Sequence, residues 1–284
     1  MLAGFANAQK SVKTNTPFQG NTKGHIYIQW GWNRGFYSNC DLTLKGDDYS
    51  IVLNKIKAHD KWTKPVSYHN YLDVRRLTIP QTNFRAGLFI KENLAISLGF
   101  DHMKYVMAQN QIVQIDGIIS KPESPYQGEY HADAIMILED FLQFEHTDGL
   151  NYENVELRYS NRLYDLKSFS FNYTAGVGTG ILLPKTNTTL LDMERHDDYH
   201  LSGYGISGVI GINALFFHHF FIQAEMKTGV INMPDIRTTI DPSDHAHQQF
   251  VFYQHNIVFG ALIHFGRQTK IQGTTDRTEN ETLN

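Results

Sequence analysis

The sequence predicts an all-β fold, an antiparallel β-barrel that crosses a membrane. Three observations in the 284 residues favour this fold. Apolar side chains alternate with small polar ones over many segments, the links between segments are of two lengths, and no segment has the ~18 consecutive apolar residues of a membrane-spanning helix. Lipid outside and a polar lumen inside produce such alternation, because successive side chains of a strand point to opposite faces.

Eight segments show the alternation, most clearly Ser168 to Ile181, where residues of one parity are apolar and those of the other are small and polar. In chain order they are residues 25–33, 83–91, 94–101, 152–159, 168–181, 203–213, 219–230 and 251–265. The links at 91–94, 161–167 and 214–218 are short, and those at 59–81, 107–150, 184–201 and 232–248 are long. This matches the short periplasmic turns and long extracellular loops of outer-membrane barrels.

Two further strands are expected between Phe36 and Ala58. Residues 37–44 and 49–57 can supply them, joined by a turn at Gly46-Asp47, although their alternation is poorer. The sequence therefore predicts an antiparallel transmembrane barrel of about ten strands, with eight and twelve as alternatives.

A soluble β-sandwich or lipocalin-like barrel also alternates, but it would turn its apolar parity inward and its polar parity to water. Here the polar parity is mainly Gly, Ser, Thr and Asn rather than Lys and Glu, which favours a lumen. Aromatic residues near strand ends are expected at the membrane interfaces. They are Trp30, Trp32, Tyr159, Tyr204 and Tyr253.

The composition excludes several classes of function. A net charge of -4 gives no basic surface of the kind that binds nucleic acid. The single cysteine, Cys40, excludes an intramolecular disulfide framework. The histidines at 196, 200, 245 and 247 lack the spacing of a zinc site, so we predict no metal and no cofactor.

The chain divides into four predicted parts. Ala6-Asn7-Ala8 fits the small-x-small cleavage site of a secretory signal peptide and follows a short apolar stretch. We therefore expect a residual signal peptide at 1–8, with Gln9 as the first mature residue. A periplasmic segment at 9–23, the barrel at 24–266 and a polar disordered tail at 267–284 follow.

The link from Ala108 to Gly149 is the most distinctive loop, because it is acidic and carries one base, Lys121. Its carboxylates lack the spacing of a calcium site, so they are interpreted as a solvated surface. Five apolar residues in it have helical spacing, which predicts a short amphipathic helix within this extracellular loop. They are Ala134, Ile135, Leu138, Phe141 and Leu142.

Several charged residues fall on the predicted lumen face of the strands. They are Arg85, Asp101, Glu156, Arg158, His219, Glu225, Lys227 and His264. Opposite charges inside a narrow barrel must pair, because an unpaired buried charge costs several kcal/mol. We predict a polar network that plugs the lumen, with a pore lining or a ligand cavity as the alternative.

The chain from Gly24 to Phe265 resembles a bacterial outer-membrane β-barrel of the type common in the Bacteroidota. The phrases DHMKYVM (Asp101–Met107) and FEHTDGLNY (Phe144–Tyr152) resemble parts of an uncharacterised family of that type. The resemblance implies the outer membrane of a Gram-negative cell and no particular activity. Such barrels usually end on an aromatic residue, whereas here a polar tail follows Phe265.

A surface hydrolase is the alternative function. His146-Thr147-Asp148-Gly149 resembles the His-x-Ser signature of outer-membrane lipid A deacylases, although Thr147 is adjacent to the histidine and no serine follows at the required position. Rim histidines and aspartates also resemble those with which omptin proteases activate water. His146 and Asp148 are the candidate catalytic residues of this alternative.

The leading hypothesis is a non-enzymatic barrel with a plugged polar lumen. It would act as a small, porin-like pore or as a structural or accessory subunit of a cell-envelope complex. The expected partners are outer-membrane lipid, with lipopolysaccharide or other envelope proteins as further candidates.

Overall fold

The computed structural model describes residues 23–64, 67–71, 73, 80–166, 169–193 and 196–263, and within them the chain forms fifteen strands and one short helix. The elements are β1 (Ile26–Tyr37), β2 (Cys40–Gly46), β3 (Tyr49–Ile56), β4 (Ala58–His59), α1 (Tyr68–Tyr71), β5 (Thr82–Lys91), β6 (Leu94–Met107), β7 (Ile112–Ile119), β8 (Gly128–Met136), β9 (Leu142–Leu166), β10 (Phe169–Leu182), β11 (Lys185–Leu190), β12 (His196–Tyr199), β13 (Gly203–Phe216), β14 (Phe220–Arg237) and β15 (His245–Ile263). No helix in these ranges has the length and apolar character needed to cross a membrane.

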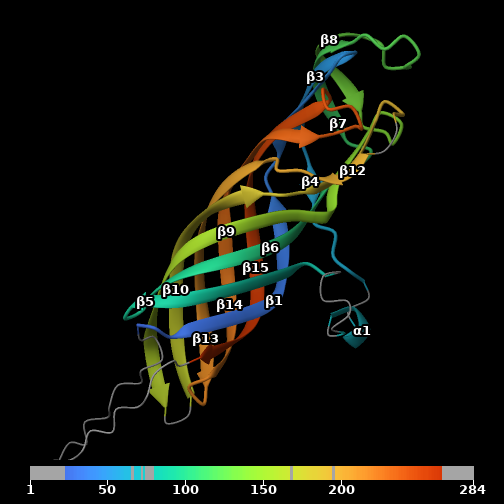
Figure 1. Ribbon diagram of the computed structural model, residues 1–284. Helices are drawn as coiled ribbons and strands as arrows, with labels where there is room; N and C mark the ends of the chain where they lie inside the picture. Colours follow the sequence, from blue (N-terminus) through green and yellow to red (C-terminus); the bar gives the residue numbers. More distant parts are fainter. Residues whose placement is uncertain are drawn as a thin grey trace, which may run out of the picture.

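Eight antiparallel strands close into a ring in the order β1, β5, β6, β9, β10, β13, β14 and β15, with β15 pairing back to β1 (Figure 1). Paired residues traced around the ring from Ile26 return to β1 at Phe36, ten residues further along the strand. This offset tilts the strands, and eight tilted strands leave an interior just wide enough for side chains.

The outer face of the ring is an apolar belt. Every second residue of the wall strands points outward, and most of these are Ile, Leu, Val, Phe or Ala, such as Ile28, Leu98, Leu157, Val177, Ile210 and Ile257. A closed ring leaves no unpaired strand edge in hydrocarbon. The all-β antiparallel prediction is therefore confirmed, and the ring is a transmembrane barrel of the outer-membrane type.

Beyond the belt, at the end opposite the short turns, the sheet continues into a second structure, which we call the extension (Figure 1). The extension consists of β2, β3, β7 and β8, and it joins the ring where β2 pairs with the start of β15. On the same side, β4 pairs with the end of β6, and β11 and β12 add to the start of β9.

The polarity of the extension is the reverse of that of the wall. Leu42, Leu44, Ile51 and Leu53 are buried in a large apolar core that also contains residues of the upper ends of the wall strands. The alternate residues of β2 and β3 face outward and are mostly polar. The extension is thus built like a soluble sheet, whereas the wall is built for lipid.

The predicted ten-stranded wall is wrong, and the ring contains the alternative number, eight. The two additional strands do form, as β2 and β3, but they lie in the extension. The eight alternating segments of the sequence are the eight strands of the ring.

The predicted helix between Ala134 and Leu142 is also wrong. Ile135 lies in β8, opposite Val113 of β7, while Phe141 and Leu142 are buried in the extension core. The hydrogen bonds of the β7–β8 ladder and this core override a local spacing that fits a helix. The predicted segments at 1–8 and 267–284 lie outside the described residues, as does the predicted segment at 9–23 except for Lys23.

Candidate functional site

Six charged side chains meet inside the barrel, and we call this cluster the lumen network. It comprises Arg85 from β5, Asp101 from β6, Glu156 and Arg158 from β9, and Glu225 and Lys227 from β14. All six are buried. They come together because each stands on the inward parity of its strand, at neighbouring positions in the register of the ring.

Glu156 accepts from three cations. Arg85 donates through Nη2 at 2.9 Å, Arg158 donates through Nε at 2.6 Å, and the Lys227 ammonium lies 2.7 Å from Oε1. Arg158 also pairs with Glu225, and Lys227 also pairs with Asp101. Three positive and three negative groups thus form one electrically balanced cluster.

Neutral polar groups complete the lumen network. Arg85 donates to Ser97 Oγ at 3.1 Å and to Asn154 Oδ1 at 2.7 Å. Glu225 accepts from Gln223 at 2.5 Å and from Asn256 at 3.2 Å. Hydrogen bonds of this kind are what makes a buried ion cluster tolerable, because the attraction between the charges alone does not repay their desolvation.

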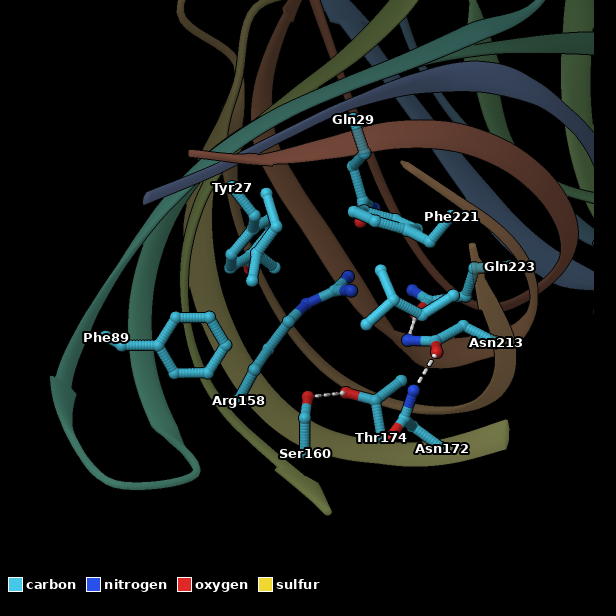
Figure 2. Close-up of a pocket in the computed structure, with 12 residues that line it drawn as sticks. Tyr27, Gln29, Phe89, Arg158, Ser160, Asn172, Thr174, Asn213, Phe221 and Gln223 are labelled. Atoms are coloured by element: carbon cyan, nitrogen blue, oxygen red, sulfur yellow. Dashed lines mark hydrogen bonds between the residues drawn. The ribbon is translucent and has the colours of Figure 1, made fainter. Parts of the chain in front are cut away.

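A small space inside the barrel lies below the lumen network, toward the short turns. It measures about 30 Å³, enough for one or two water molecules. Figure 2 shows Arg158 reaching into it past Tyr27 and Phe89, with Asn172 and Thr174 on the far side. A space of this size is a hydration site and not a passage.

Apolar side chains lie at both ends of the lumen network. Along β14 the inward residues run from Phe221 through Gln223, Glu225, Lys227 and Gly229 to Ile231. Phe221 belongs to an apolar cluster at the end of the short turns, with Tyr27, Phe89, Ala95, Leu215 and Leu262. Ile231 belongs to the apolar core of the extension, which covers the other end of the barrel interior. The interior therefore has an apolar, a charged and a second apolar layer.

One of the eight residues expected in the lumen, His219, is not part of this cluster. His219 lies in the exposed turn between β13 and β14, and its Nδ1 is 3.4 Å from the carbonyl oxygen of Leu262. The alternation of inward and outward side chains is interrupted between β13 and β14, because Phe217 and His218 adopt positive φ angles in the turn. His264 lies outside the described residues.

His146 and Asp148 do not form a catalytic pair in the described structure. His146 lies on the part of β9 above the belt, is buried, and is hydrogen-bonded to Thr186 Oγ1 at 3.0 Å and Gln248 Nε2 at 3.2 Å. Burial lowers the pKa of His146 to about 3. Asp148 is exposed and pairs with Lys185 at 3.6 Å. A neutral, enclosed imidazole without a carboxylate partner is poorly placed to activate water.

The other rim histidines are dispersed over the end of the barrel that carries the extension. His200 Nε2 lies 2.9 Å from Asp235, and His247 Nε2 lies 3.1 Å from Asn232. In the part of the chain that the structure describes, no three His, Cys, Asp or Glu residues are arranged to hold a metal ion.

Sequence reasoning missed a basic and aromatic group on the outside of the barrel, just beyond the belt. It comprises Arg34 on β1, Lys61, Trp62 and Lys64 after β4, and Lys104 on β6. The available signal was the run KAHDKWTK at residues 57–64, which places three lysines around a tryptophan directly after a strand.

Comparisons with known proteins show a distant likeness in shape. No protein-family model and no curated protein sequence matches the chain. Among solved structures it is similar to the outer membrane protein OprG from Pseudomonas aeruginosa, with 12% identity, coverage of 87% of this chain and 100% of that chain, and a TM-score of 0.39. It is also similar to the outer membrane protein AlkL, with 9% identity, coverage of 94% of this chain and 99% of that chain, and a TM-score of 0.42. For Neisserial surface protein A the identity is 10%, the coverage is 86% of this chain and 100% of that chain, and the TM-score is 0.36.

Proposed function

We propose that this chain is a non-conducting barrel of the bacterial outer membrane whose role is to hold the extension at the cell surface, as a structural or accessory part of the envelope. The wall supplies the membrane anchor, and the extension supplies the surface that other envelope components meet. The type of bacterium suggested by the sequence stays a prediction.

One observation carries this proposal. The lumen network fills the middle of the barrel, and the space beside it measures about 30 Å³. An ion passing through would have to break several buried ion pairs and then cross two apolar layers, each of which disfavours a charge. This arrangement supports the accessory role over a small pore.

Single-channel recording tests the proposal. Purified protein reconstituted in a planar bilayer is expected to give no steady current steps, while a general porin in the same membrane gives them. Heat-dependent migration of the protein on a gel, and its protection from added protease by lipid, verify that the silent protein is folded and inserted. Stable current steps that scale with salt concentration, from inserted wild-type protein, would contradict the proposal.

A further inference from the structure

A hollow of about 900 Å³ lies on the outside of the wall, in the part of the apolar belt where β5, β6, β9 and β10 lie side by side (Figure 1). It exists because two outward residues at its centre, Ala86 on β5 and Thr179 on β10, are short. The outward residues around them are long, namely Phe84, Leu98, Phe100, Ile181 and Tyr204. The wall is therefore indented at this place.

The hollow continues down the belt toward the short turns. A second hollow, of about 660 Å³, shares Val155 and Thr179 with the first and also borders Leu157 and Val177. In the register Val155 pairs with Thr179 and Leu157 pairs with Val177, so these residues form two successive outward rows. We call the two adjoining hollows the belt furrow. Its elongated apolar floor fits an alkyl chain, which gains contacts along its whole length.

One carboxylate, that of Glu153 on β9, borders the furrow at the end nearer the extension. Glu153 stands on the outward face, paired in the register with Phe100 of β6 and Ile181 of β10. The next positions on that face of β6 and β9 are His102 and Asn151, which are buried, with His102 Nδ1 2.8 Å from Asn151 Oδ1. From there toward the extension, none of the described apolar residues of β6 and β9 is exposed. Glu153 thus lies where the hydrocarbon-facing surface of these strands ends.

Glu153 is exposed, and it has no hydrogen-bond or ion-pair partner among the residues that the structure describes. The carboxylates on the inner face of the same wall differ in this respect, since Glu156 is paired with three cations. An ionised group at the edge of hydrocarbon is costly unless a partner compensates it. The side chain is therefore a free acceptor for a cation that comes from the membrane.

A hydroxyl group borders the same end of the furrow. Tyr204 of β13 stands on the same outward row as Glu153, on the other side of Ile181. Its hydroxyl oxygen accepts from Asn232 Nδ2 at 3.0 Å, which leaves the hydroxyl hydrogen to be donated. The end of the furrow thus offers a negative acceptor and a neutral donor, which complement a headgroup that carries both a cation and an anion.

We propose that the belt furrow binds one lipid of the leaflet on the side of the extension, with an acyl chain along Val155 and Thr179 and a primary ammonium group of the headgroup at Glu153. The Tyr204 hydroxyl then donates to the headgroup phosphate. The occupant is a lipid because the furrow opens onto the belt, and its headgroup carries an ammonium because the free charge at the furrow is negative. The site lies outside the wall, so it goes beyond the proposed function and does not depend on whether the barrel conducts.

Native mass spectrometry of the full chain in detergent tests the inference. The probes are phosphatidylethanolamine, which carries a primary ammonium, and phosphatidylglycerol with the same acyl chains, which carries no cation. Wild type is expected to bind phosphatidylethanolamine roughly fivefold more tightly, the effect of one partly exposed ion pair. Glu153→Gln is expected to bind the two lipids equally. The matched control Glu139→Gln, which removes an exposed carboxylate after β8, is expected to keep the wild-type preference.

A second pair of variants tests the place of the acyl chain. Thr179→Phe fills the centre of the furrow and is expected to weaken the binding of both lipids, whereas Thr179→Val keeps the size of the side chain and is expected to bind like wild type. Heat-dependent gel migration verifies that each variant is folded.

Equal binding of the two lipids by wild type, or an unchanged preference in Glu153→Gln, would overturn the inference. Unchanged binding of both lipids by Thr179→Phe would also overturn it, because the chain would then lie elsewhere. A conducting barrel that keeps the lipid preference would contradict only the proposed function, and a silent barrel without the preference would contradict only the lipid site.

Discussion

Glu156 lies where the side chains of three cations converge, Arg85, Arg158 and Lys227. A single carboxylate has enough lone pairs to accept from all three, and Asp101 and Glu225 balance the remaining charge. The consequence is mutual dependence, since removing one charge leaves another buried without a counterion.

Replacing Lys227 with methionine is expected to cost about 3–5 kcal/mol of unfolding free energy, because Asp101 loses its main cation in a buried site. Urea unfolding in lipid vesicles, followed by tryptophan fluorescence, measures the loss. The double variant Asp101→Asn/Lys227→Met keeps the charges balanced and should lose less than the single variant. A loss below about 1 kcal/mol for Lys227→Met alone would show that the ion pair contributes little.

The six charged members of the lumen network could be predicted from the sequence. In a strand, every second side chain points to the same face, so the position of a residue in the alternation decides whether it points into the lumen. Gln223 and Asn256 share that parity, but nothing in the sequence distinguishes them from other small polar lumen residues. His219 could not be placed by parity, since the turn at 217–219 interrupts the alternation. The contact of Arg34 with Trp62 could not be predicted, because it joins β1 to the segment that follows β4 and no local sequence pattern encodes it.

At the scale of elements, β2 and β3 were predicted correctly as strands but were placed in the wrong part of the molecule. The sequence predicts that both segments are strands. Whether they lie in the lipid-facing wall or in the water-exposed extension has to be read from the polarity of their outward residues. Asp41 and Lys45 stand on the outward parity of β2, where a wall strand would meet lipid. Charges on that parity are the sign that these strands belong to a water-exposed sheet and not to the ring.

Gly117 is the residue on which the pairing of β3 with β7 depends. It has a φ of +116°, and a Cβ there would collide with the backbone oxygen of Ser50. Gly117→Ala is therefore expected to loosen the extension and to accelerate proteolysis between residues 108 and 140, while the barrel keeps its heat-dependent gel migration. Gly128→Ala is the matched control, because the nearest atom to its Cβ would lie at 3.8 Å. Equal proteolysis of both variants would show that Gly117 has no special role.

At the scale of the whole molecule, two residues of equal exposure separate the membrane-facing surface from the water-facing one. Leu98 of β6 is 68% exposed on the belt, and Ile112 of β7 is 67% exposed on the extension. Leu98→Arg is expected to cost about 2–4 kcal/mol in lipid vesicles, since its charge would enter hydrocarbon. Ile112→Arg should change stability by no more than about 0.5 kcal/mol. Folding titrations in vesicles measure both, and equal costs would contradict the assigned belt.

The last strand, β15, pairs with both the wall and the extension. Its length from Phe252 to Ile263 pairs with β1 and closes the ring, while its start, from His245 to Gln248, pairs with β2 and connects the extension. During synthesis β2 and β3 leave the ribosome long before this strand exists. A chain that stops short of β15 therefore lacks both the partner that closes the ring against β1 and the strand that joins β2 to the wall.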